Sequence, residues 1–466
     1  MARAKAEHQV DEANASAAAE RGEPGQFHNL YFARLLQLKQ RLRQRVAEQW
    51  PEVEPSGVLE CDDGAERALI GAVYKHMRLK PTVMDEYADD RGVMASVSSA
   101  RLTSTDDAIF VEDNNARVRI RPNCCASASA DSLITGVVLA LRGHMVGGEF
   151  VPSDAIFPGP SLTNDHATTS NGHTPLSAPS ADDHGSPNAH CTHNRVLLLS
   201  GLQAGGPASA NTQLLLDFLS GDLGSESDRE LARSIARVVI AGNSVDLSEQ
   251  SAASHFGNSS HNAGANTAPA KRRECERERS RSEHRLRDMD ALLTQLACIC
   301  PTDVMPGELD PAHTALPQPP LHSALLPYAR TRVHRAPNPH AFTLDGKRFV
   351  GTSGQNIMDM LRFTELDGPI ECLSKALQWQ HLAPSAPDTL PCHPSKMKDP
   401  FVIDQIPDVL FAGNQPSFAA KRVDGRTTLV SVPSFTDTNT AVLLDLTNFS
   451  VELLCFEAAP NLGDQT

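Results

Sequence analysis

The first regular pattern of hydrophobic positions lies between Tyr31 and Trp50. Apolar residues recur there at three- to five-residue spacing, basic residues fill much of the opposite side, and Pro51 follows. This period predicts an amphipathic α-helix that ends at the proline. The basic side could be a surface for a partner, but docking of the helix on its own domain is the favoured interpretation. The apolar positions are Leu30, Leu35, Leu38, Leu42 and Val46, and the basic ones are Arg34, Lys39, Arg41, Arg43 and Arg45.

Between residues 55 and 157 the pattern changes to short apolar runs, and Gly147-Gly148 predicts a hairpin turn between two of them. About five short strands in this length suit a small barrel such as an OB fold. Such barrels can bind single-stranded nucleic acid through exposed aromatic side chains. The few aromatic residues here lie inside the apolar runs, which favours a role in the core. The runs are Ala68–Tyr74, Ile109–Val111, Val118–Ile120 and Ile134–Leu141.

The second half of the chain contains continuous apolar runs instead of alternating ones. Val196–Leu199 and Arg237–Ala241 are such runs, and an amphipathic helical pattern around Leu214 and Phe218 separates them. Strand, helix and strand in this order, with fully apolar strands, predict a buried and mostly parallel sheet. Beyond Pro301, short apolar strands alternate with proline- and glycine-rich turns, as in the second half of a layered α/β sandwich. In such folds, the loops after the strands usually carry the chemistry.

Polar segments divide the chain into the predicted domains. We expect a disordered tail over residues 1–24, a helix and OB-fold domain over 25–157, and a disordered linker over 158–193. A second domain is expected over 194–466, with a disordered insertion at about 248–280. The linker is rich in histidine, but its spacing has no metal-site pattern, which favours a solvated loop. An arginine-rich stretch over 271–287 could be a nuclear-import signal or a solvated charged helix.

Composition narrows the possible functions. The 466-residue chain has a net charge of −15, which disfavours strong direct binding to nucleic acid. Its ten cysteines include no C-x-x-C pair, so a zinc site or redox dithiol built from cysteines is not predicted. No secretory segment and no apolar run long enough to cross a membrane is apparent, so reduced thiols in the cytosol or nucleus are expected.

Five segments of the second half are more distinctive than its composition. Together with Ser200-Gly201-Leu202 and Ala241-Gly242-Asn243, their order and spacing resemble the small, regulatory B-subunits of DNA polymerase delta. The resemblance is strongest over residues 195–446, is weaker back to the first helix and the barrel, and leaves out the tail and the long polar loops. The segments are Asp303 to Pro311, Pro317 to His322, Gly351 to Asn356, Ala386 to Leu390 and Phe411 to Phe418.

The resemblance implies an OB-fold barrel joined to a calcineurin-like phosphodiesterase domain, an α/β sandwich. Active members of that wider fold hold two metal ions through aspartates, histidines and an asparagine at successive strand ends. This sequence lacks most of these groups at the matching turns, and Asn or Gln cannot replace a bridging carboxylate. We therefore expect no catalytic, cofactor-binding or metal-binding residue, with Asp310 as a turn cap and His381 as a structural histidine. The degenerate turns contain Ser200, Leu202, Asn243, Glu308, Leu309, Asp310, His381, Asn414, Gln415 and Pro416.

The resemblance also implies a non-catalytic scaffold function. Such a protein binds the C-terminal metal-binding domain of the catalytic subunit and a third, elongated subunit in the nucleus. It would reach the sliding clamp indirectly and DNA only through the complex, with no membrane partner. The alternatives are a B-subunit of polymerase alpha or epsilon, a divergent metallophosphoesterase, and an independent single-strand-binding protein.

Overall fold

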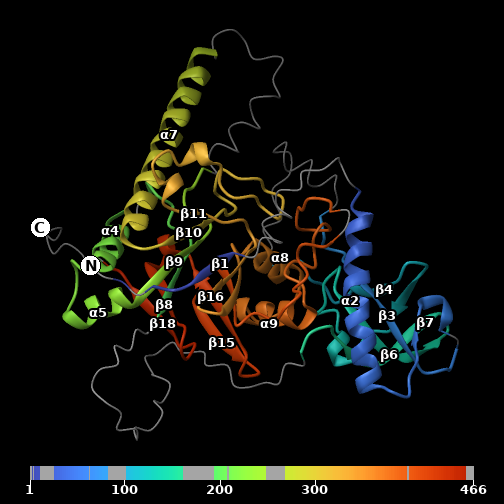
Figure 1. Cartoon of the computed structure of the whole chain (residues 1–466). Helices are drawn as coiled ribbons and strands as arrows, with labels where there is room; N and C mark the ends of the chain where they lie inside the picture. The colour runs from blue at the N-terminus through green and yellow to red at the C-terminus, as the bar shows by residue number, and fades with distance from the viewer. Residues whose placement is uncertain are drawn as a thin grey trace, which may run out of the picture.

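A computed structural model describes residues 3, 5–10, 26–61, 63–81, 101–160, 194–206, 209–247, 268–395 and 398–457. Within these residues the strands form three six-stranded sheets. Two sheets stack into a sandwich, and the third curls into a barrel beside it (Figure 1).

The barrel is built from the first half of the chain. The order β2-β3-β4-β5-β7-β6 is closed by an antiparallel pairing of β3 with β6, so this sheet wraps around its own core. The β6–β7 hairpin turns at Gly147 and Gly148, both with positive φ, which confirms the predicted hairpin. The elements are α2 (His28–Gln49), β2 (Pro55–Ser56), η1 (Val58–Glu60), β3 (Arg67–His76), β4 (Ala108–Glu112), β5 (Arg117–Ile120), η2 (Ala126–Ala128), β6 (Val138–Val146) and β7 (Glu149–Ile156).

One sheet of the sandwich has the order β11-β10-β9-β8-β17-β18. Its strands β8, β9, β10 and β11 are parallel, which confirms the parallel sheet predicted from the continuous apolar runs. The elements are β8 (Arg195–Leu199), α4 (Ser209–Ser220), α5 (Glu226–Ser234), β9 (Ile235–Ala241), α7 (Ala268–Ile299), β10 (Thr302–Met305), η3 (Ser323–Leu325), η4 (Ala329–Thr331), β11 (His334–Arg335), β17 (Thr440–Asp445) and β18 (Val451–Cys455).

The other sheet of the sandwich has the order β1-β12-β13-β14-β16-β15. Strands β13, β14 and β16 are parallel, while β1, β12 and β15 pair antiparallel with their neighbours. The elements are β1 (His8–Val10), β12 (His340–Leu344), β13 (Lys347–Thr352), α8 (Gln355–Phe363), α9 (Pro369–Trp379), β14 (Val409–Gln415), β15 (Ala419–Val423), β16 (Thr427–Pro433) and α10 (Phe435–Thr438).

Successive side chains along each strand point to opposite faces of the sheet, and this explains how the layers of the sandwich pack. On β8, Val196 and Leu198 face the second sheet, while Leu197 and Leu199 face α4, α5 and α7. On β14, Phe411 faces the first sheet and Leu410 lies in the core that contains α8 and α9. Both faces of each sheet are therefore covered, which is why the sequence shows apolar runs without alternation.

The helix α2 is docked on its own chain, as the favoured interpretation predicted. Its apolar side packs on the barrel strands β3 and β6 in a buried cluster that includes Leu38, Leu42 and Val46. Arg34, predicted on the polar side, is wholly buried. It reaches across to the second domain, so α2 lies between the barrel and the α8–α9 side of the sandwich (Figure 1).

The predicted disordered tail over residues 1–24 is wrong for its early part. Strand β1 pairs antiparallel with β12, with His8 opposite Leu344 and Val10 opposite Phe342. A three-residue strand has too few positions to show a period, and its stability comes from an edge more than 300 residues away, so no local signal marks it. Residues 11–25 lie outside the described residues.

The predicted disordered insertion at about 248–280 is also wrong in part, because α7 begins at Ala268. Arginine and glutamate have high helix propensity, and Arg279 pairs with Glu283 one turn later at 3.2 Å. The last turns bury Met289, Leu293 and Leu296 against the sandwich, and the rest projects from it (Figure 1). Residues 248–267, and 161–193 of the predicted linker, lie outside the described residues.

Candidate functional site: the strand-end turns and a buried histidine cluster

The turn after β8 and the carboxyl-terminal end of β14 meet through neutral groups. The Ser200 hydroxyl donates to the Pro433 carbonyl at 2.9 Å and accepts from the Asn414 backbone N–H at 2.8 Å. The Asn414 amide donates to the carbonyls of Ala241 (3.0 Å) and Ser353 (2.9 Å). Asn414 thus ties three strand ends together, and its own backbone has a positive φ of 54°. Hydroxyl and amide groups hold this junction without any carboxylate or imidazole.

The turns after β9 and β10 interlock in the same way. The Asn243 side-chain oxygen accepts the Leu309 backbone N–H at 3.0 Å. Asp310 accepts backbone N–H groups of Val245 (3.0 Å) and Gly307 (2.8 Å), one with each carboxylate oxygen. Burial outweighs these hydrogen bonds and raises the pKa of Asp310 to about 6. The carboxylate is therefore committed to the backbone, which agrees with the predicted turn cap.

Among the described residues, the remaining members of these turns join no cluster of three or more possible metal ligands. Leu202 is buried in the apolar core under α4, Leu309 is half-buried, and Glu308 is exposed to solvent. Gln415 is buried and donates to the Gly413 carbonyl at 2.7 Å, while Pro416 is exposed.

His381 does not join these turns. Its Nε2 lies 3.0 Å from an Asp399 carboxylate oxygen, and its Nδ1 accepts the Ala383 backbone N–H at 3.2 Å. The same Asp399 oxygen accepts from Arg34 Nε of α2 at 2.7 Å. Burial and the positive charge of Arg34 lower the pKa of His381, so the ring is neutral at pH 7. The group is a buried junction between α2 and the second domain, and no part of a strand-end site.

Comparison with known proteins identifies the family. Residues 26–154 match the OB-fold domain of the DNA polymerase delta subunit, and residues 196–420 match the B-subunit family of DNA polymerases alpha and epsilon. The DNA polymerase delta small subunit of Oryza sativa subsp. japonica is 32% identical over 470 residues, which cover 98% of this chain and 99% of the relative.

The chain belongs to the family of DNA polymerase delta small subunits. The small subunit of Arabidopsis thaliana is 34% identical, covering 94% of this chain and 92% of the relative. DNA polymerase delta subunit 2 of Drosophila melanogaster is 31% identical, and the match covers 92% of this chain and 93% of the relative. The predicted resemblance to the delta type is thereby confirmed.

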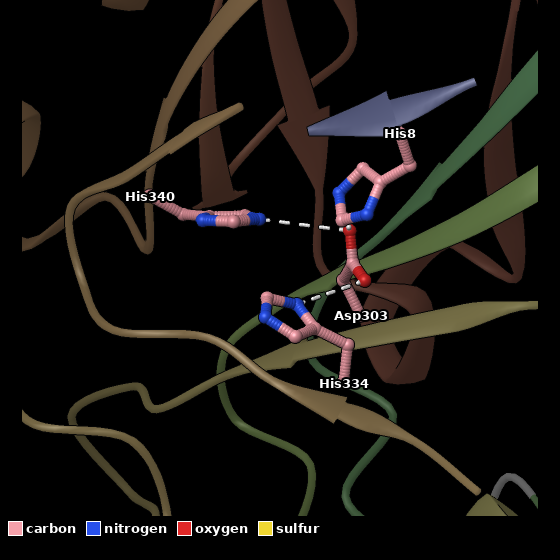
Figure 2. Close-up of side chains that lie close together, drawn as sticks. All are labelled: His8, Asp303, His334 and His340. Atoms are coloured by element: carbon pink, nitrogen blue, oxygen red, sulfur yellow. Dashed lines mark hydrogen bonds and ion pairs between the residues drawn. The ribbon is translucent and has the colours of Figure 1, made fainter. Parts of the chain in front are cut away.

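In this delta-type small subunit, the groups that could bind a metal gather at a different place from the turns. Among the described residues, His8, Asp303, His334 and His340 each offer one ligand atom, and these atoms lie within 4.8 Å of one another. The residues come from β1, β10, β11 and β12, so the cluster lies at one edge of the sandwich where both sheets contribute. Figure 2 shows the three imidazoles around the single Asp303 carboxylate.

The two oxygens of the Asp303 carboxylate have different surroundings. Its Oδ1 accepts from Arg237 Nη1 at 2.5 Å and lies 3.1 Å from His334 Nδ1. Its Oδ2 faces His340 Nε2 at 3.5 Å and His8 Nε2 at 3.6 Å (Figure 2). These two distances exceed the 2.7–3.2 Å that an N–H···O hydrogen bond prefers. Oδ2 and both facing nitrogens have no hydrogen-bond partner among the described residues.

Burial sets the charges of this cluster. It lowers the pKa of His8 to about 4 and also lowers the pKa of His340, so both rings are neutral at pH 7. Burial alone would raise the pKa of Asp303, but contacts with His334 and His340 and the charge of Arg237 outweigh it and lower that pKa. The ionised Asp303 carboxylate thus faces the neutral imidazoles of His8 and His340.

The sequence interpretation missed this cluster, although one signal was present. Asp303 lies inside a buried strand, where an ionised side chain needs partners. Its three histidine neighbours are spread from position 8 to position 340, and only the sheet topology brings them together.

In addition, none of the helices that the structure describes is long and apolar enough to cross a membrane.

Proposed function

We propose that the chain is a non-catalytic, architectural subunit of a DNA polymerase delta assembly. Its similarity to DNA polymerase delta small subunits over nearly the full length supports an accessory role in DNA replication. The observation that carries the architectural role is the state of the strand-end turns. The Ser200 hydroxyl, the Asn243 side-chain oxygen and the Asn414 side-chain N–H group join neighbouring strands, and Asp310 uses both carboxylate oxygens on backbone N–H groups.

The finer proposal is that the sandwich is an inactive relative of the calcineurin-like phosphodiesterases. Two-metal hydrolysis needs carboxylates and imidazoles that converge on a pair of cations and activate a water between them. The parallel strands and the position of the turns at their carboxyl ends support the relationship in fold. The loss of activity is supported by the neutral side chains of Ser200, Leu202, Asn243 and Asn414 at those turns, and by the use of the Asp310 carboxylate on backbone N–H groups. Polymerase and proofreading chemistry then belongs to a partner subunit.

The proposed partners follow from the family. We expect the chain to hold the C-terminal metal-binding domain of the catalytic subunit and a third, elongated subunit, and to reach the sliding clamp and DNA through them. The net charge of −15 supports indirect contact with DNA. A nuclear location is proposed because replication takes place there.

Affinity purification of the tagged chain from its own cells tests this function. A polymerase catalytic subunit is expected in near-equal molar amount, and the purified chain alone is expected not to hydrolyse a phosphodiester in the presence of Mn²⁺. A monodisperse chain without a polymerase partner would contradict the assignment. Turnover of the phosphodiester would contradict the inactive state of the turns separately, because it does not depend on recovering a partner.

A further inference from the structure

We propose that His8, Asp303, His334 and His340 form a binding site for one divalent transition-metal ion, with zinc as the preferred ion. The proposal concerns a place in the fold that the strand-end turns do not share, and it does not depend on which partners the chain binds. The ion would fasten the N-terminal strand β1 to the sandwich, because His8 is the ligand that this strand supplies.

The residue types suit zinc. Three imidazoles and one carboxylate give four ligands, which is the number that a closed structural zinc site uses. Neutral imidazole is a ligand for zinc, copper, iron and nickel, whereas magnesium and calcium prefer oxygen. His340 is wholly buried, so the site is closed on that side and leaves little room for exchangeable water.

The distances also suit a shared ion. Zinc–nitrogen bonds of about 2.0–2.1 Å place two ligands of a tetrahedral ion about 3.3 Å apart. Asp303 Oδ2 lies 3.5 Å from His340 Nε2 and 3.6 Å from His8 Nε2, which is close to that separation and longer than a hydrogen bond. The widest pair of ligand atoms, within 4.8 Å, must close by about 1.5 Å, and rotation of an imidazole supplies this.

Three of the polar atoms at this point have no other role among the described residues. Asp303 Oδ2, His8 Nε2 and His340 Nε2 are buried, face one another and have no hydrogen-bond partner. Buried polar atoms are almost always paired, so a group of three that converge calls for a common partner. A cation between them would satisfy all three.

Arg237 supports the arrangement from outside. It donates to Asp303 Oδ1 and so orients the carboxylate with Oδ2 toward the two histidines. Ligand carboxylates in metal sites are commonly hydrogen-bonded in this way through their other oxygen. Arg237 lies on β9, next to β10, so the backbone pairing of the two strands fixes its position.

Zinc binding by the full-length chain tests the proposal, with His8→Gln as the main variant. His8 lies on a short edge strand, so its replacement leaves the core intact, and glutamine keeps the length while removing the ring nitrogen. Zinc affinity is measured at neutral pH by competition with a chromophoric chelator. One zinc ion per chain is expected for the wild type, with an affinity loss of more than about 100-fold in His8→Gln. His393→Ala, a histidine outside the cluster, is the matched control and should bind as the wild type does.

X-ray absorption at the zinc edge is a second measurement, because it identifies the ligands of the bound zinc ion directly. A purely structural role of these histidines would not produce such a spectrum. Nitrogen and oxygen ligands with an imidazole signature are expected, without sulfur. When the chain is purified with partners, the difference between wild type and His8→Gln cancels any zinc that the partners or other histidines hold. Equal zinc content and affinity in wild type and His8→Gln would overturn the proposal, as would a sulfur-rich zinc spectrum in the chain alone.

Discussion

The buried contact of Arg34 makes the most demanding prediction about how the two domains are joined. Its guanidinium donates to Asp399 Oδ2 at 2.7 Å and to the carbonyls of Pro384 and Ala386, both at 2.6 Å. The Arg34 and Asp399 side chains are 1% and 0% exposed. Arg34→Met keeps most of the apolar length of the side chain and removes every one of these bonds.

The expected loss of stability is large, because the partners stay buried. Breaking a buried ion pair by removing one member costs about 3–5 kcal/mol, since an unpaired charge remains. His381 still contacts Asp399 at 3.0 Å and offsets part of this loss by holding the carboxylate. We therefore expect Arg34→Met to lower the free energy of unfolding by about 3 kcal/mol or more.

Urea unfolding followed by tryptophan fluorescence measures this effect in each half of the molecule. The chain has two tryptophans: Trp50 directly follows α2, and Trp379 ends α9, so versions that keep one of them report one side each. Both reporters should show unfolding at a lower urea concentration in Arg34→Met than in the wild type, and together, because the barrel and the α8–α9 side still share one apolar core and the contact of Lys75 with the Phe363 carbonyl.

Arg43 supplies the matched control for this experiment. It lies on the same helix but is exposed, so Arg43→Met should change the free energy of unfolding by no more than about 0.5 kcal/mol. The double variant Arg34→Met with Asp399→Asn should lose less than the sum of the two single variants, because no unpaired charge remains. Equal effects of Arg34→Met and Arg43→Met would refute the reasoning.

Two further predictions concern the strand-end turns. Because burial raises the pKa of Asp310 to about 6 from 3.8, its contribution to stability is complete below about pH 4 and is lost as the pH rises through 6. The difference in unfolding free energy between wild type and Asp310→Asn should therefore shift against the wild type by up to about 3 kcal/mol between pH 4 and 7, and a flat difference would contradict the shifted pKa. At Gly242, with φ of 83°, an added Cβ would lie 2.8 Å from Gly307 Cα, whereas at Gly346, with φ of 73°, it would meet nothing within 4 Å. Gly242→Ala should cost about 1–3 kcal/mol more than Gly346→Ala in the same unfolding assay, and equal losses would show that the turns are not closely packed.

The sequence predicted those parts of the fold that depend on local pattern. The continuous apolar runs at Val196–Leu199 and Arg237–Ala241 became adjacent parallel strands, because strands covered on both faces have no polar side. The helix after the tail, the Gly147-Gly148 hairpin and the neutral residues at Ser200, Asn243 and Asn414 were likewise visible in the sequence. These features are encoded by neighbours in the chain.

The features that the sequence did not predict depend on contacts between distant residues. Arg34 sits among exposed arginines on a helix, and only the position of Asp399 explains why it is buried. Strand β1 exists because the edge of β12 is available to it. The histidine cluster depends on two such contacts. The pairing of β1 with β12 positions His8, and the position of β10 places Asp303 next to it. A period in the sequence carries no information about such pairings.

Anomalous X-ray diffraction from crystals of the full-length chain, grown with Mn²⁺ and Zn²⁺, tests the central claim most directly. The strand-end turns around Ser200, Asn243, Asp310 and Asn414 are expected to show no anomalous peak, because both Asp310 carboxylate oxygens accept backbone N–H groups and the side chains of Ser200, Asn243 and Asn414 are neutral. Two ions bound there by side chains of this chain would contradict the architectural role and restore a metal-dependent hydrolase as its function.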